Sequence, residues 1–314
     1  MRAKLPAAVF LLVLALGLCA CGGGSSRDES ANVPVDPSAP LDVPQHSNVV
    51  VLVLENTNYA DVVGNPSMPY MNGLIAQGGL ATNYTANVHP SLPNYFVLTT
   101  GQTITNSNDY PGPANVDNVV RQLAAAGKTW KAYAESLPSV GYLGGDRYPY
   151  VKRHNPFVYF TDVLDNAANA ARVVPFSQFA SDLGGGLPNY AFVMPNNIHN
   201  GHDCPAGQFQ CTQNEKLATV DGWLRQNIGP LVDSAQFKAN GLLIVTYDED
   251  AGSGGPNGGR IATVLVGPKV RPGFQSTTAY QHESVLKLTM NTLGVRQVPG
   301  GATTAPSMSE FFVP

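Results

Sequence analysis

The chain has 314 residues, a formal net charge of −4 at pH 7 and 43% hydrophobic residues. This length and composition suit one large α/β domain with a substantial core. The mild acidic balance argues against nucleic acid as a partner, because nucleic-acid-binding domains carry a strongly basic surface.

The N-terminus has the pattern of an export signal. A short basic stretch at residues 1–4 precedes an apolar run at 7–18, which is too short for a good membrane span. The sequence around Cys19-Ala20-Cys21 resembles a bacterial lipoprotein processing site and predicts lipidation of Cys21; ordinary cleavage near Ala20 is the alternative.

Three segments follow from this pattern. We expect a signal peptide at 1–20, a flexible Gly-, Ser- and Pro-containing linker at 21–45 and one folded domain at 46–314. The protein would then be exported, either lipid-anchored to a bacterial membrane or periplasmic or secreted. Contact with the membrane would run only through the N-terminal lipid.

Strand and helix patterns alternate through the predicted domain. The β-branched run at 48–54 is typical of a fully buried parallel strand. The alternation predicts a three-layer αβα sandwich with a mostly parallel central sheet. In chain order we expect a strand at 48–54, a helix at 68–77, a strand at 79–85, helices at 94–100 and 116–126, strands at 128–134 and 190–194, a helix at 215–228, strands at 241–246 and 261–266, and a helix at 283–293.

Acidic and amide side chains follow two of these strands. Glu55-Asn56 come after the first, and Asp248-Glu249 come after the strand at 241–246. Ligands of open α/β sheets bind outside the carboxyl ends of strands, and adjacent acids repel unless a cation lies between them. A shared divalent cation is therefore predicted. Helix capping by Asn56 and a solvated acidic turn are the alternatives.

A serine lies between two prolines in the segment His89-Pro90-Ser91-Leu92-Pro93-Asn94-Tyr95. It precedes a predicted helix, where the helix dipole and unpaired N–H groups favour phosphate. Ser91 is therefore a candidate nucleophile. The alternative is an ordinary N-cap serine, and Asn94 could cap the same helix.

Five of the six histidines lie in or beside such segments. His154 could bind phosphate or transfer protons, His199 and His202 follow the strand at 190–194, and His282 begins a helix. Each histidine alone is more often an ordinary hydrogen-bonded residue, but their co-occurrence favours chemistry.

Two cysteines remain outside the export signal, Cys204 and Cys211. Their close spacing in an exported chain predicts a disulfide that braces the His202 loop. A zinc-binding pair is the alternative.

Taken together, these segments resemble the bacterial acid phosphatase and phospholipase C-type phosphoesterases of the alkaline phosphatase superfamily, in particular the small secreted acid phosphatases. The resemblance runs in order from about residue 48 to 293. Its carriers are Leu54-Glu55-Asn56, Pro90-Ser91-Leu92-Pro93-Asn94-Tyr95, Tyr133-Ala134-Glu135, Arg153-His154-Asn155-Pro156-Phe157, His202-Asp203-Cys204, Tyr247-Asp248-Glu249 and His282-Glu283-Ser284.

The resemblance implies an alkaline phosphatase-like fold and a role for each matching residue. Asn200, where the family usually has an acid, weakens the case for a second metal. One divalent cation (Ca²⁺, Mg²⁺, Mn²⁺ or Zn²⁺) would be held by Glu55, Asn56, Asp248 and Glu249, with Ser91, His154 and His202 as catalytic residues and Asn94 and His282 as substrate-binding residues.

The expected function is metal-dependent phosphomonoester hydrolysis through a phosphoserine. The substrate would be a phosphomonoester, with phospholipids and phosphoinositides among the candidates. A phosphodiesterase of phospholipase C type and a non-catalytic phosphate- or glycan-binding lipoprotein are the alternatives.

Overall fold

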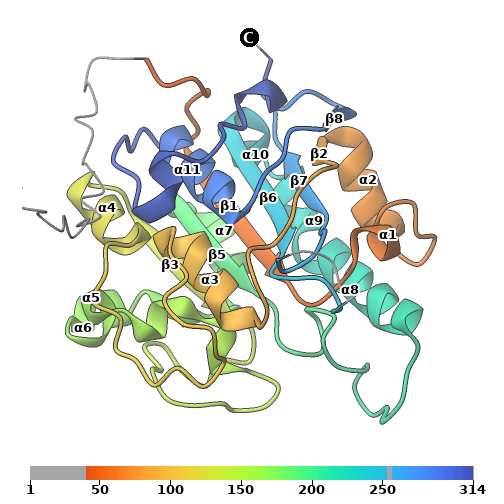
Figure 1. Cartoon of the computed structure of the whole chain (residues 1–314), viewed down its shortest axis with the longest axis horizontal. Helices are drawn as coiled ribbons and strands as arrows, with labels where there is room; N and C mark the ends of the chain where they lie inside the picture. Colours follow the sequence, from red (N-terminus) through yellow and green to blue (C-terminus); the bar gives the residue numbers. More distant parts are fainter. Residues whose placement is uncertain (1–39, 253–256, 314) are drawn as a thin grey trace, which may run out of the picture. The chain divides into compact units, whose positions relative to one another are not determined.

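The computed structural model describes residues 40–252 and 257–313 (Figure 1). The predicted signal peptide, Cys21 and most of the predicted linker lie outside these residues. Among the helices that are described, none combines the length and the apolar character needed to cross a bilayer.

Within these residues the chain forms an eight-stranded sheet in the order β4-β3-β5-β1-β6-β7-β2-β8. All neighbouring strands are parallel except at β7, which runs antiparallel to both β6 and β2. The prediction of a mostly parallel sheet is confirmed. The strands are β1 (Asn48–Leu54), β2 (Gly79–Ala81), β3 (Trp130–Ala134), β4 (Val173–Pro175), β5 (Tyr190–Met194), β6 (Gly241–Tyr247), β7 (Thr263–Val266) and β8 (Phe274–Ser276).

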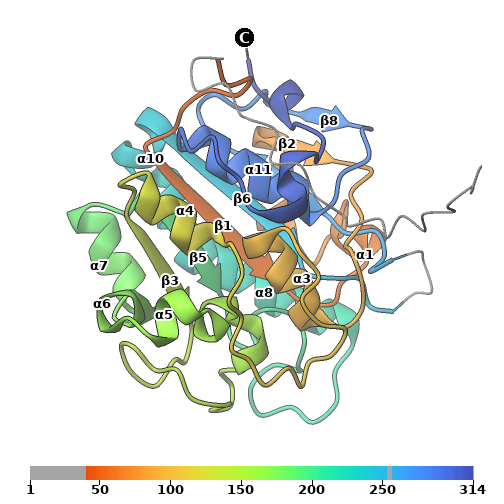
Figure 2. The same cartoon turned by 60° about the vertical axis from the view of Figure 1, so that its left-hand side comes forward.

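Helices cover both faces of the sheet, which gives the predicted αβα layering (Figures 1 and 2). Helices α3, α4 and α11 lie on one face, and α2, α7 and α8 lie on the other. The α-helices are α1 (Tyr59–Val62), α2 (Pro69–Gln77), α3 (Ser91–Thr100), α4 (Val119–Ala125), α5 (Thr161–Leu164), α6 (Ala167–Ala170), α7 (Gln178–Gly185), α8 (Gln213–Asn227), α9 (Gly229–Asp233), α10 (Ala235–Asn240) and α11 (His282–Thr292), with 3-10 turns η1 (Lys152–His154), η2 (Pro156–Tyr159), η3 (Gly300–Thr303) and η4 (Ser309–Phe311).

Helix α3 begins three residues earlier than predicted. Pro90 is its N-cap and Ser91 its first residue. The first turn of a helix does not use its own N–H groups, so Pro93 fits there without loss of a hydrogen bond. The serine therefore belongs to the helix, and Asn94, which was expected as a possible cap, lies inside it.

The register between β1 and β6 brings two distant segments together. All residues of both strands are buried, and Leu54 pairs with Tyr247, the last residue of each strand. The N–H of Asp248 donates to the carbonyl of Leu54 at 2.9 Å, which extends the pairing by one step. The polar residues after each strand therefore leave the sheet side by side.

Candidate active site

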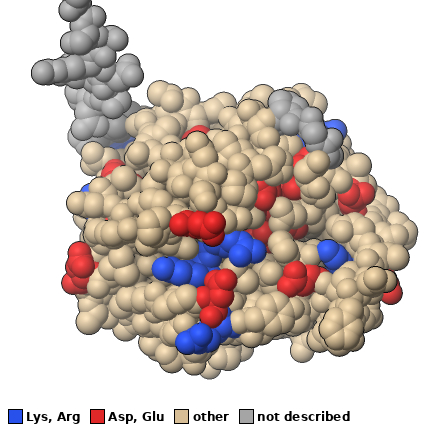
Figure 3. Space-filling model, turned by 60° about the horizontal axis from the view of Figure 1, so that its bottom comes forward, with Lys and Arg blue, Asp and Glu red and all other residues tan. Residues whose placement is uncertain are grey.

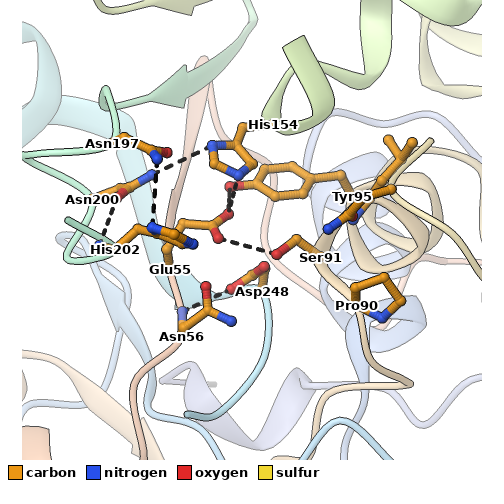
Figure 4. A network of polar contacts seen from close by, with 12 residues as sticks. Glu55, Asn56, Pro90, Ser91, Tyr95, His154, Asn197, Asn200, His202 and Asp248 are labelled. Carbon is orange, nitrogen blue, oxygen red and sulfur yellow. Dashed lines mark hydrogen bonds and ion pairs between the residues drawn. The ribbon is translucent and has the colours of Figure 1, made fainter. Parts of the chain in front are cut away.

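Glu55 lies at the centre of a buried polar network (Figure 4). Its Oε1 accepts a hydrogen bond from the Tyr95 hydroxyl at 2.6 Å. The Ser91 Oγ lies 3.1 Å from Glu55 Oε2 and 3.0 Å from Glu249 Oε1. A hydroxyl carries one proton, so Ser91 donates to one of these two carboxylates at a time.

Asn56 ties the two strand ends together. Its backbone N–H donates to Asp248 Oδ1 at 3.1 Å, and its Nδ2 donates to Glu249 Oε1 at 2.8 Å. The residue has a φ of 35°, in the left-handed region that asparagine tolerates better than most residues. This conformation accompanies the contacts of Asn56 with the two acids that directly follow β6.

Three carboxyl groups crowd this network, and their pKa values are raised accordingly. Burial raises the pKa of Glu55 to about 7, with the charge of Glu249 adding and the Tyr95 hydrogen bond opposing. Burial and the charges of Glu55 and Glu249 raise the pKa of Asp248 well above its usual range. Burial also raises the pKa of Glu249. Such a site disfavours three negative charges unless a cation is bound.

The donor atoms fit a hard divalent cation. Asn56 Oδ1 and Asp248 Oδ2 are buried oxygens without a hydrogen-bond partner among the described residues. Glu55, Asn56, Asp248 and Glu249 all offer side-chain oxygen, which Ca²⁺, Mg²⁺ and Mn²⁺ prefer. In residues 40–252 and 257–313, no three His, Cys, Asp or Glu side chains already stand in a metal-binding arrangement. A cation would therefore have to draw the carboxylates closer together.

His154 joins the network from η1. Its ring is buried, stacks on Tyr95 with centroids 5.5 Å apart, and places Nε2 3.3 Å from Glu55 Oε1. Nδ1 lies 3.5 Å from the side-chain nitrogen of Asn200. Burial, with smaller effects from the charges of Arg153 and His202, holds the pKa of His154 well below its usual range. The ring is therefore neutral near pH 7.

His202 lies beside this network and is partly exposed. Its Nδ1 is 2.6 Å from Asp203 Oδ1, and its carbonyl accepts a hydrogen bond from Lys216 at 2.6 Å. The predicted disulfide between Cys204 and Cys211 is present and follows the His202 turn directly.

Asn94 and His282 support the site instead of facing a substrate. The side chain of Asn94 is buried and bonds to the backbone of Asn87 and Val88, which holds the loop before Ser91. His282 is fully buried, with Nε2 2.8 Å from the Asp248 carbonyl and Nδ1 3.1 Å from the Tyr84 hydroxyl. These contacts fit a positioning role better than the substrate-binding role predicted for both residues.

The amide groups at the start of α3 are less available than the sequence suggested. The N–H of Leu92 donates to Asn108 at 3.0 Å, and Pro93 has no N–H. Among Ser91, Leu92 and Pro93, only Ser91 has a backbone N–H that is not bonded to another side chain. The start of the helix therefore offers a phosphate fewer hydrogen-bond donors than expected.

The roles of two residues, His89 and Glu135, were not predicted. His89 places Nδ1 2.6 Å from Glu249 Oε2 and Nε2 3.3 Å from Asp250 Oδ1; its position two residues before Ser91 was the available signal. Glu135, at the end of β3, accepts hydrogen bonds from the N–H of Asn196 at 3.0 Å and from the indole of Trp223 at 3.0 Å, and lies 2.9 Å from His199 Nδ1. Glu135 thus anchors the start of the loop that carries His202.

Comparisons with known proteins agree with this geometry. The chain is 33% identical over 273 residues to the phosphatidylinositol-3-phosphatase of Mycobacterium tuberculosis, covering 86% of this chain and 84% of that protein. It is 32% identical over 282 residues to the acid phosphatase of Aspergillus fumigatus, covering 83% of this chain but only 58% of that longer protein. A solved Vibrio parahaemolyticus protein of the alkaline phosphatase superfamily shares the fold, with a TM-score of 0.58 and 16% identity over 82% of this chain and 68% of that one.

The protein is therefore a phosphoric ester hydrolase with an alkaline phosphatase-like α/β fold. Residues 65–296 match the Phosphoesterase family, and the chain belongs to that family.

Proposed function

We propose that this protein is an exported, metal-dependent phosphomonoesterase in which Ser91 attacks phosphorus. The observation that carries the proposal is the position of the Ser91 hydroxyl. It stands on the first residue of α3, within 3.1 Å of Glu55 and 3.0 Å of Glu249, and carboxylates on both sides orient its oxygen and can accept its proton.

The cation site supports the same proposal. Glu55, Asn56, Asp248 and Glu249 would hold one divalent ion, because their side chains converge from two adjacent strand ends and include unpaired buried oxygens. When bound, such an ion supplies positive charge that stabilises the anionic transition state of phosphoryl transfer. Tyr95 and His282 fix Glu55 and the backbone of Asp248.

The proposed reaction has two balanced steps. The Ser91 oxygen forms a bond to phosphorus, its proton passes to a neighbouring carboxylate, and the bond to the leaving oxygen breaks. That oxygen takes a proton from His202, whose Nδ1 is held by Asp203. Water then attacks the phosphoserine and gives a proton back to His202. The bond between phosphorus and the Ser91 oxygen breaks, Ser91 takes its proton back from the carboxylate, and phosphate leaves.

The substrate class and location complete the proposal. A relative named as a phosphatidylinositol-3-phosphatase supports a phosphoinositide as a candidate substrate. Export, with Cys21 as the lipidated residue, is supported by the N-terminal sequence pattern. A phosphodiesterase activity has no observation of its own in its favour.

Turnover of p-nitrophenyl phosphate and of bis-p-nitrophenyl phosphate, compared between wild type and Ser91→Ala, tests the proposal. We expect hydrolysis of the monoester by wild type and at least about a thousandfold loss in Ser91→Ala, with an unchanged thermal midpoint. Preference for the diester would overturn the monoesterase assignment, and wild-type rates in Ser91→Ala would exclude the nucleophile.

A further inference from the structure

We infer that Arg153 binds an oxyanion of the substrate at the rim of the candidate active site. The inference deepens the proposed function and rests on it, since it names a recognition residue that the two chemical steps do not use. The ligand it would take is a phosphate-type oxyanion.

The position of Arg153 follows from its neighbours. It is the middle residue of η1, directly before His154, whose ring lies against Tyr95 and within 3.3 Å of Glu55. Successive residues of a 3-10 turn point about 120° apart. His154 is buried, whereas Arg153 is half-buried, so the guanidinium lies at the border between the network and solvent.

The second observation is an unpaired cation. The Nε of Arg153 is buried and has no hydrogen-bond partner among the described residues. Over the same residues, no carboxylate forms an ion pair with Arg153. Two other cations of the fold have carboxylate partners: Arg121 bonds to Asp162 at 2.9 Å, and Lys131 bonds to Asp182 at 2.6 Å.

An oxyanion would satisfy this group. Partly burying a guanidinium without an acceptor costs free energy, which a hydrogen-bonded anion would recover. The planar fork of arginine also matches two oxygens of one phosphate. The adjacent Lys152 does not compete for this role, because its ammonium lies 4.6 Å from the centre of the Tyr159 ring.

The surrounding surface allows an anionic ligand to approach. Figure 3 shows Lys and Arg side chains gathered near the centre of the lower side of the molecule, with acidic side chains around them. The segment around residue 150 runs along this side (Figure 1). The segment at 146–153 carries Arg147, Lys152 and Arg153 against Asp146 alone, so its formal charge is positive.

Two parts of a substrate could supply the oxyanion, namely the phosphate that Ser91 attacks and a second phosphate on the same molecule. Arg153→Gln and Arg153→Lys separate them when each full-length variant is tested with fructose 6-phosphate, with fructose 1,6-bisphosphate and, by calorimetry, with inorganic phosphate. Arg147→Gln is the matched control, because it removes the same charge from an exposed position on the same segment.

If Arg153 binds the reacting phosphate, Arg153→Gln should weaken inorganic phosphate binding and lower kcat/KM for both sugar phosphates by about tenfold. If it binds a second phosphate, the tenfold loss should appear only with the bisphosphate. Arg153→Lys, which keeps the charge but loses the fork, should fall in between, and Arg147→Gln should stay within about twofold of wild type.

The inference is overturned if Arg153→Gln and Arg153→Lys, with wild-type thermal midpoints, stay within about twofold of wild type with every ligand, or if Arg147→Gln loses as much. Wild type that hydrolyses neither the sugar phosphates nor p-nitrophenyl phosphate would instead overturn the proposed function. Calorimetry with inorganic phosphate would then be the only test of Arg153, and a wild-type protein that binds no phosphate would refute the inference.

Discussion

In the protein without a cation, the ionisation of Glu55 should oppose folding as the pH rises. Its pKa is about 7 in the fold, against an ordinary value of 4.5. Below pH 4.5 the carboxyl is protonated in both the folded and unfolded chain. Between pH 4.5 and 7 this carboxyl ionises in the unfolded chain first, so its contribution to the free energy of unfolding falls as the pH rises.

The expected size follows from the two pKa values. The pKa of Glu55 differs between about 7 in the fold and 4.5 in the unfolded chain. At about 1.4 kcal/mol for each pKa unit, ionisation of Glu55 lowers the free energy of unfolding by about 3 kcal/mol. In a domain of this size, each kcal/mol moves the thermal midpoint by about 2–4 °C. In the presence of a chelator, the change in thermal midpoint from about pH 4.5 to about pH 7.5 should therefore be about 6–12 °C less favourable in wild type than in Glu55→Gln. Buried histidines such as His46 and His282, whose lowered pKa values act in the opposite direction, cancel in this comparison.

Glu55→Gln should reduce this pH-dependent loss, because an amide does not titrate. Thermal unfolding followed by circular dichroism measures it, with Asp162→Asn as the control. The hydrogen bond from Arg121 lowers the pKa of Asp162 despite partial burial, so Asp162 is ionised in both states above pH 4.5 and contributes no slope. Parallel pH profiles for chelated wild type and Glu55→Gln would refute this electrostatic account of the site.

Two other expectations follow from neighbouring contacts. Asp248→Ala should lower bound metal, measured by elemental analysis, and turnover together, whereas a variant that keeps its metal and most of its rate would contradict the cation site. Glu135→Gln should lower the free energy of unfolding by about 1–3 kcal/mol and raise KM by loosening the His202 loop. It should also change the fluorescence of Trp223, whose indole donates to Glu135. Unchanged fluorescence and KM would show that Glu135 does not anchor the His202 loop.

The sequence predicted the long elements and missed the short ones, for a physical reason. The runs that became β1, β5 and β6 are buried throughout and almost entirely apolar, and such runs are recognisable as buried strands without any knowledge of their partners. Strands β4 and β8 have three residues each, too few to show a period. The antiparallel direction of β7 depends on its neighbours and has no local signature.

The site was predictable in composition but not in geometry. Acids after strands marked Glu55 and Asp248, yet nothing local indicates that β1 and β6 pair in register, which brings Asn56 and Asp248 together from positions 192 apart in the sequence. The roles of His89 and Glu135 were not predicted, because each depends on a contact made far along the chain. The sequence identified which residues carry the chemistry better than it identified which residues position them.

The surroundings of the histidines decide which one can donate a proton to the leaving group. His282 has both ring nitrogens engaged, and burial lowers its pKa to about 4. His154 is buried and neutral. His89 has both ring nitrogens beside carboxylates. Of the three histidines predicted to be functional, His202 remains, because it is partly exposed and only its Nδ1 is engaged, by Asp203 and more weakly by Asn197. A proton donor matters most when the leaving oxygen is a strong base.

His202→Gln should therefore slow phenyl phosphate hydrolysis by about a hundredfold or more, and p-nitrophenyl phosphate hydrolysis much less, since nitrophenolate leaves without protonation. His154→Gln is the matched control and should slow both substrates by a similar factor. The measurement is kcat/KM for the two esters at one pH. Equal losses for both esters in His202→Gln would show that His202 does not protonate the leaving oxygen in the first step of the proposed reaction.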